Sequence, residues 1–230
     1  MKRIVFAMLA VAMLTSCNIR VNKTISGYVE ESRELTGFER IVMMGSMDVE
    51  YIQADSFSVK VHAPNVEEMK KVETVVEGNE LKISMKNSSN FFRFGSSDAD
   101  NITVYVTSPD FLGVRLLGSG DFLSDQPLDT DTLTIELRGS GDIRFNDVIC
   151  DHADVSLVGS GDVSLDKIQT QWAGLNVVGS GDIKAYLENS GAVDAQVKGS
   201  GDIELKGAVR KMNKQVRGSG DIDSDELIVR

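Results

Sequence analysis

The chain has few of the residues that would indicate a disulfide-stapled, proline-rich or nucleic-acid-binding protein. Its 230 residues include 2 cysteines, 3 prolines and 1 tryptophan, and aromatic residues make up 6%. Two cysteines cannot build a disulfide framework. Basic residues are also in the minority, since 24 Lys and Arg stand against 35 Asp and Glu, a net charge of −11. This acidic balance excludes an electrostatic hold on nucleic acid, and the short basic run at 211–217 is predicted to be a solvated face.

Glycine, in contrast, is abundant. There are 21 glycines, and 41% of the residues are hydrophobic, an ordinary share for a folded protein. Many glycines with few prolines predict repeated tight bends and not flexible linkers. The length suits one or two domains with a sizeable core.

Residues 1–16 predict a secretory signal peptide. Lys2 and Arg3 form its positive start, and residues 4–14 are an apolar run of eleven residues, too short to span a bilayer. Residues 14–17, Leu-Thr-Ser-Cys, resemble a bacterial lipobox, in which the cysteine is lipidated and becomes the first residue. We therefore predict lipid attachment at Cys17, which makes the membrane a partner. An ordinary signal peptide with an incidental cysteine is the alternative.

The expected mature chain begins with a lipidated tether at residues 17–27. Loss of Lys2 and Arg3 leaves 22 basic against 35 acidic residues, a net charge of −13. The tether lacks an acidic cluster of the kind that sends some lipoproteins to the cell surface. We therefore predict an outer-membrane lipoprotein of the bacterial cell envelope that faces the periplasm. Because the lipid occupies Cys17, Cys150 has no disulfide partner and is expected to be buried.

A four-residue motif, Gly-Ser-Gly-Asp, repeats through the second half of the chain. Successive copies are separated by 21, 20, 20, 20 and 19 residues. Such regular spacing indicates a repeat architecture. The copies begin at Gly118, Gly139, Gly159, Gly179, Gly199 and Gly218.

Apolar residues recur at fixed places around each motif. Counted from the first glycine as zero, positions −2 and +4 are apolar in every copy, position −4 in all but the last, and position +6 in all but the first and the last. All four are even numbers, so in extended chain they share one face. We expect that face to form the core, both glycines to point inward, and Ser at +1 and Asp at +3 to face solvent.

The predicted fold is all-β: a parallel β-helix-like β-solenoid of about 20-residue coils over residues 114–230. Residues 28–113 are predicted to be a divergent, less regular β region. Within it, residues 45–48, Gly-Ser-Met-Asp, echo the motif with the same apolar frame. Further expected features are strands at 57–61, 81–85 and 102–106, a helical turn at 66–71, and a polar loop at 87–100 that contains Phe91, Phe92 and Phe94.

These features together resemble the GIN-domain family, described as autotransporter adhesin head domains. The resemblance spans most of the mature chain. It rests on residues 37–42 (Gly-Phe-Glu-Arg-Ile-Val), on Asp48-Val49, on residues 79–83 (Asn-Glu-Leu-Lys-Ile) and on the repeats. It implies a secreted or lipid-anchored protein with a β-helix-like fold and an adhesin-like role.

The outward residues of the motif form a candidate binding ridge. Stacked carboxylates repel one another, and calcium could bridge them. Calcium-binding solenoid repeats, however, have a period of about nine residues, which this chain lacks. We expect instead that the Asp side chains accept hydrogen bonds from turn amides, and we predict no metal and no cofactor. The ridge comprises Ser119, Asp121, Ser140, Asp142, Ser160, Asp162, Ser180, Asp182, Ser200, Asp202, Ser219 and Asp221.

Catalytic residues are not predicted. Asp151, His152 and Asp154 cluster near Asp147, but such a group on a strand edge is usually a surface feature. Cleavage of a polysaccharide needs a distinctive pair of acids or a basic residue. Six identical Asp residues are more typical of a repeated scaffold than of such an active site.

Other isolated residues carry weak signals. His62, His152 and Cys150 lack the spacing of metal ligands. Trp172 could stack on a sugar, although a structural bend is the favoured interpretation.

We therefore predict a lipid-anchored cell-envelope β-solenoid that is not an enzyme and has a binding, adhesin-like or structural role. A glycan or a protein is the expected ligand. The alternative is a polysaccharide-active β-helix enzyme, which would need a pocket with convergent acids and a basic residue. The coil ends allow self-association, although Asp223, Asp225 and Glu226 resemble a charged cap against it.

Overall fold

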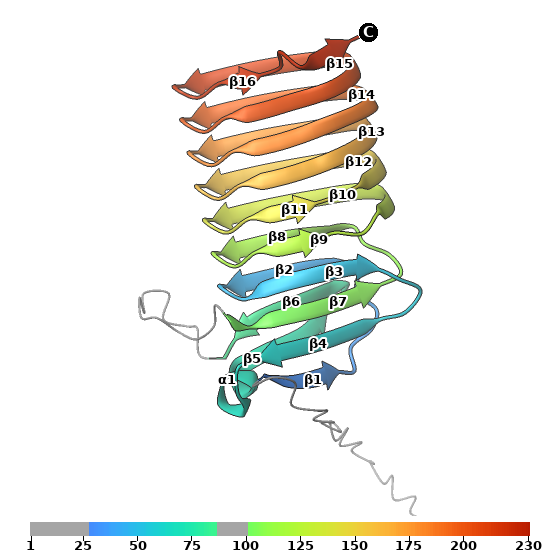
Figure 1. The fold of residues 1–230 in the computed structure, drawn as a ribbon, viewed down its shortest axis with the longest axis vertical. Coiled ribbons are helices and arrows are strands. Elements are labelled where there is room, and N and C mark those ends of the chain that lie inside the picture. Colours follow the sequence, from blue (N-terminus) through green and yellow to red (C-terminus); the bar gives the residue numbers. More distant parts are fainter. Residues whose placement is uncertain (1–27, 87–100) are drawn as a thin grey trace, which may run out of the picture.

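The computed structural model describes residues 28–86 and 101–230. The predicted signal peptide, Cys17, the tether and the predicted loop at 87–100 with its three phenylalanines lie outside the described residues. The described chain forms a tall stack of coils, shown in Figure 1 from the blue and green strands at one end to the red strands at the other. The predicted β-solenoid is confirmed.

Each Gly-Ser-Gly-Asp motif ends one long strand of a coil. In order, the strands that belong to the exact repeats are β8 (Gly113–Gly118), β9 (Phe122–Ser124), β10 (Leu128–Gly139), β11 (Ile143–Phe145), β12 (Val148–Gly159), β13 (Val163–Gly179), β14 (Ile183–Gly199) and β15 (Ile203–Gly218). Neighbouring coils pair in parallel, and the first glycine of each motif is opposite the first glycine of the next. The motif therefore sets the register of the whole stack.

The predicted inward columns form the core. The apolar residues at +4 are at most 2% exposed in every coil, and those at −2 are fully buried from Leu116 to Val197. Val216, the last member of the −2 column, is 40% exposed because it lies in the terminal coil. In the lower coils, the rings of Tyr51, Phe111 and Phe122 stack in the interior.

The glycines are required by the close approach of neighbouring coils. The second glycine of the first five motifs is buried, as expected. A Cβ on Gly161 would lie 1.9 Å from the carbonyl oxygen of Gly141 in the coil below. Gly159 has the same conflict with Gly139, and its φ of +143° also disfavours a side chain. Side chains are therefore excluded at these glycines because the backbones of neighbouring coils are in contact, and not because the interior of the solenoid is narrow.

The divergent coil predicted around Gly45 is confirmed. Its two strands, β2 (Arg40–Gly45) and β3 (Asp48–Gln53), pair in parallel with β8 and β9. Gly45 lies opposite Gly118, and Ile41, Met43 and Val49 are buried like their counterparts in the repeats. On the other side, β2 pairs with β6 (Glu80–Met85) and β3 with β7 (Thr103–Ser108).

Antiparallel strands close the N-terminal end. Strand β4 (Ser58–Ala63) pairs with β7 and with β1 (Val29–Arg33), while β5 (Val72–Glu77) pairs with β6. The predicted helical turn is helix α1 (Val66–Lys71), whose N-cap Asn65 accepts a hydrogen bond from the Glu68 amide. The predicted strands at 57–61, 81–85 and 102–106 correspond to β4, β6 and β7, whereas β1 and β5 were not predicted.

The C-terminal end is only partly covered. Strands β16 (Ile222–Asp223) and β17 (Leu227–Val229) pair with the first half of β15. Residues 210–218 of β15 pair with β14 on one side, and no other described strand pairs with their outer edge. At the −4 position of this coil, the Lys214 amine lies 3.4 Å from Ser224 Oγ. A polar contact thus replaces the apolar column at the end of the core.

Candidate functional site

The Asp residues of the candidate binding ridge are bonded from coil to coil. In each pair, an Asp side chain accepts a hydrogen bond from the backbone amide of the Asp one coil further along. The predicted bonding to turn amides is therefore confirmed, with donors that lie in the neighbouring coil. The bonds run from the amides of Asp121, Asp142, Asp162, Asp182, Asp202 and Asp221 to Oδ1 of Asp48, Asp121, Asp142, Asp162, Asp182 and Asp202, at 2.7 to 3.0 Å.

We call this column of bonded Asp residues the Asp ladder. Its hydrogen bonds hold neighbouring coils together and engage many of the polar groups of the ridge. One carboxylate oxygen of each bonded Asp is engaged with an amide, and the backbone of the motif is bonded as well: the Ser160 amide donates to the Gly139 carbonyl at 2.9 Å. Within residues 28–86 and 101–230, no group of three or more His, Cys, Asp or Glu residues has a geometry suited to a metal ion. The groups of the ridge that the Asp ladder leaves available to a ligand are the serine side chains and the second carboxylate oxygens.

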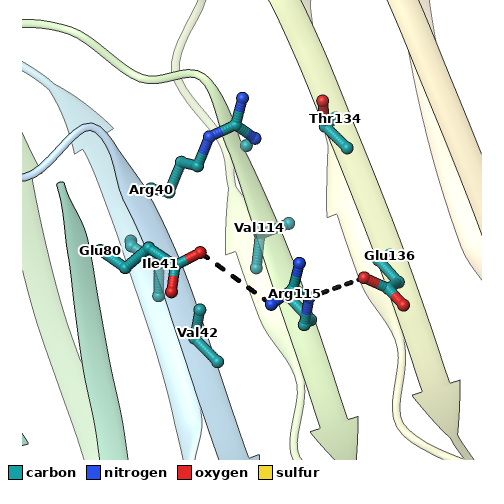
Figure 2. Close-up of a pocket in the computed structure, with 9 residues that line it drawn as sticks. Arg40, Ile41, Val42, Glu80, Val114, Arg115, Thr134 and Glu136 are labelled. Atoms are coloured by element: carbon teal, nitrogen blue, oxygen red, sulfur yellow. Dashed lines mark hydrogen bonds and ion pairs between the residues drawn. The ribbon is translucent and has the colours of Figure 1, made fainter. Parts of the chain in front are cut away.

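A shallow hollow lies on the outer face of the wall formed by β6, β2, β8 and β10. Figure 2 shows Arg115 at its centre, between Glu80 and Glu136. Arg115 Nε lies 2.6 Å from Glu136 Oε2, and Arg115 Nη1 lies 3.9 Å from Glu80 Oε1. Arg138 also pairs with Glu136, at 2.6 Å. The charges in this hollow therefore neutralise one another.

The electrostatics of this hollow are unfavourable for acid catalysis. Partial burial acts to raise the pKa of Glu136, but hydrogen bonds from Arg115 and Arg138 outweigh it and lower the pKa below its usual range. A general acid needs the opposite shift, because it must hold its proton near neutral pH. Acids and a basic residue do converge here, but as an ion-pair network.

The other predicted candidates are separated in the structure. His62, on β4, pairs with Glu30 of β1 at 2.5 Å. Cys150, on β12, is a buried free thiol, as predicted, and burial raises its pKa. His152 is exposed, with its ring 5.9 Å from that of Trp172. The structure therefore does not bring His62, His152 and Cys150 together.

Trp172 lies on the outside of the solenoid. It follows the point in β13 where the register with β14 is irregular. Its side chain, however, extends over the wall, and its indole Nε1 donates to Asp194 Oδ2 at 2.9 Å. From the sequence we favoured a structural bend at Trp172, and we did not predict that its indole lies on the outer wall.

The fold and the N-terminal motif define a class: a bacterial envelope lipoprotein with a β-solenoid body. Residues 1–18 match the profile of the prokaryotic membrane lipoprotein lipid attachment site. Residues 37–186 and 162–230 match a family described as "Putative auto-transporter adhesin, head GIN domain". The chain belongs to this family. Among the described residues, no helix has the length and hydrophobicity needed to cross a membrane.

Solved structures with the same fold come from Bacteroides and Parabacteroides species. A "putative adhesin" from Bacteroides fragilis has a TM-score of 0.68 and 23% identity, with 86% of this chain and 97% of that chain covered. A "putative lipid binding protein" from Parabacteroides distasonis also has a TM-score of 0.68, with 20% identity and coverages of 89% and 98%. A "putative adhesin" from Parabacteroides merdae has a TM-score of 0.56, with 16% identity and coverages of 89% and 97%. No curated protein matches the chain.

Proposed function

We propose that the protein is a non-enzymatic, adhesin-like binding protein, anchored by lipid at Cys17 after removal of a signal peptide at residues 1–16. One observation carries the binding role: the interior is filled by the apolar columns, and the hollows found on the described residues are open to solvent on the outer walls. A ligand must therefore meet the exterior, where the rigid stack presents flat polar walls. The names given to similar solved structures, two a "putative adhesin" and one a "putative lipid binding protein", agree with a binding role.

The anchor and the stack together suit presentation of a surface at a distance from the membrane. The tether precedes β1 at the capped end, and the repeats extend away from that end. We propose an outer-membrane lipoprotein that faces the periplasm, because no acidic cluster follows Cys17. Protease added to intact cells should then leave the protein whole and should cut it once the outer membrane is opened. Cleavage on intact cells would contradict the periplasmic orientation.

The binding role is tested with the lipidated full-length protein in liposomes. Such liposomes should be retained on at least one member of a panel of immobilised neutral glycans, acidic glycans and envelope proteins. Liposomes without protein serve as the control. Retention on none of these surfaces would overturn the binding role and leave a structural one. Replacement of Cys17 by Ser should release the protein from the membrane fraction.

A further inference from the structure

One position on the outer wall of β12–β15 has no side chain, because it is a glycine, Gly174. On this wall, the position five residues before each motif is occupied by Asp154, Gly174, Asp194 and Asn213, which pair in register from coil to coil. A Cβ on Gly174 would lie 2.4 Å from Cη2 of Trp172. The indole ring therefore covers the wall where Gly174 leaves space, between the Asp154 and Asp194 coils.

The indole is fixed in this position by hydrogen bonds. Its Nε1 donates to Asp194 Oδ2 at 2.9 Å, and Asn213 Nδ2 donates to Asp194 Oδ1 at 2.6 Å. These two bonds, first that of Asn213 and then that of Trp172, lower the pKa of Asp194. Asp194 is thus a fixed acceptor and not a proton donor. An aromatic ring that is already ordered loses little conformational entropy when a ligand packs against it.

Amide side chains lie beside the ring. Gly174 and Asp194 line an open hollow together with Asn176, Gln196 and Gln215. Gln196 Nε2 donates to Gln215 Oε1 at 2.6 Å, which orients both amides. Amides both donate and accept hydrogen bonds, as sugar hydroxyls do. The indole ring, which lies against Gly174 and is bonded to Asp194 of this hollow, is therefore next to fixed donors and acceptors.

The fold itself does not require an aromatic residue here. Trp172 is opposite Ala192 in the next coil, and both coils keep the same buried column at Ala173 and Val193. Phe111 and Phe122, whose rings stack on each other, are by contrast buried in the core. A half-buried indole on the outer wall, over a glycine, is therefore an addition to the repeat.

We propose that this surface, the Trp172 face (Asp154, Trp172, Asn176, Asp194, Gln196 and Gln215), binds a neutral carbohydrate. The apolar side of a sugar ring packs against the indole, and its hydroxyls meet the amides and carboxylates. Two aspartates and one lysine, Lys214, line the hollow, and this local excess of negative charge, with the net charge of −11, disfavours an anionic polysaccharide. The inference rests on the proposed binding role and names the ligand class.

The test uses the single tryptophan of the chain, because any change in tryptophan emission on binding reports on Trp172. The lipidated protein in detergent micelles is titrated with neutral glucose-, mannose- and galactose-based oligosaccharides and, separately, with polygalacturonate. At least one neutral oligosaccharide should shift the emission, and polygalacturonate should not. Calorimetry supplies the affinity for the variants.

The variants separate this face from the rest of the surface. Trp172→Ala and Gln196→Ala should each weaken binding of the active neutral oligosaccharide by about tenfold. Tyr186→Ala removes an aromatic side chain that is 46% exposed and lies outside the Trp172 face, so it should leave the affinity unchanged. Gln196→Ala keeps the indole, which guards against a folding defect in Trp172→Ala.

The outcomes distinguish this inference from the proposed function. If the wild-type protein in liposomes is retained on a surface but no neutral oligosaccharide shifts the emission, the carbohydrate assignment is wrong and the binding role stands. Equal weakening by Tyr186→Ala would also overturn the assignment to the Trp172 face. Retention on no surface at all, with no emission change, would overturn both.

Discussion

Each Asp of the first five motifs joins two coils through one side-chain oxygen. Asp162 Oδ1 accepts from the Asp182 amide at 3.0 Å, and the Asp162 amide donates to Asp142. Replacement of Asp162 by Ala should lower the free energy of unfolding by about 1 kcal/mol, because one hydrogen bond between coils is lost. Asp162→Asn keeps an acceptor oxygen and removes a like charge from the column, so it should be close to neutral.

Urea unfolding of the two variants measures this difference. Ser160→Ala, at an exposed side chain of the same motif, is a matched control and should change stability by less than about 0.5 kcal/mol. If Asp162→Asn were as destabilising as Asp162→Ala, charge would matter more than hydrogen bonding. A rise in the melting temperature with calcium would support a bridging cation instead.

Glu136 gives a pH-dependent contribution to stability. Hydrogen bonds from Arg115 and Arg138 hold its pKa in the folded protein below the ordinary value of 4.5. A group with a lowered folded pKa stabilises the fold above its unfolded pKa, and this contribution is lost as the pH falls through the folded value. Stability should therefore decline below about pH 4.5. Because the pair is partly exposed, the effect is modest.

Thermal melts from pH 7 to pH 3 test the role of Glu136. Glu136→Gln should be less stable than wild type at neutral pH and should converge with it in acid, because it has no charge to lose. A constant difference between the two proteins over the whole range would contradict the ion-pair explanation.

Single residues differ in how far their role can be predicted from the sequence. The buried columns follow from a local rule, since alternation assigns each residue to one face. The amides that donate to the Asp ladder lie about 20 residues away in the sequence. These hydrogen bonds could therefore be assigned only once the register between coils was known. Trp172 is harder still, because its orientation depends on Gly174 and on Asp194 in the next coil.

At the scale of the element, the second glycine of each motif controls how closely two coils pack. Gly161→Ala should destabilise the protein by about 3 kcal/mol or more, because its Cβ would meet the backbone oxygen of Gly141 at 1.9 Å and backbone cannot easily move aside. Gly78→Ala is the control. At Gly78 φ is +64° but no atom lies within 4 Å, so only backbone strain of about 1 kcal/mol is expected.

Chemical unfolding followed by circular dichroism measures both glycine variants. Similar losses for Gly161→Ala and Gly78→Ala would mean that the coils can separate slightly at little cost. The loss at Gly161 should also appear as faster proteolysis at the adjacent turns, because the stack is opened there.

The elements that sequence reasoning missed have no repeat to identify them. Strand β1 reads Val-Glu-Glu-Ser-Arg, and its one buried residue is Glu31, which pairs with Arg33 at 3.2 Å. Nothing in that composition favours a strand. It forms because the edge of β4 offers a full set of backbone partners. Where the 20-residue period fails, local patterns predict strands such as β4 but not which strands pair at the capped end.

The two ends of the whole molecule differ, and we expect any self-association to depend on the C-terminal end. Residues 210–218 of β15 present a strand edge to which no described strand is paired, and an open edge is a site for pairing with a second copy. Arg210, Lys211, Lys214 and Arg217 are all exposed there. Two copies that pair along residues 210–218 of this edge bring eight positive charges together, which opposes a symmetric dimer.

We therefore expect the wild-type protein in detergent micelles to be monomeric at low salt and to associate as salt screens the basic edge. The variant with Lys211, Lys214 and Arg217 replaced by Gln should dimerise already at low salt, as measured by analytical ultracentrifugation. A variant with Lys60, Lys70 and Lys82 replaced by Gln removes the same charge near the capped end and should remain monomeric. If both variants behaved alike, net charge would govern association. If only the first variant dimerised, then Lys211, Lys214 and Arg217, more than β16 and β17, would be what prevents association at the open end of the wild-type solenoid.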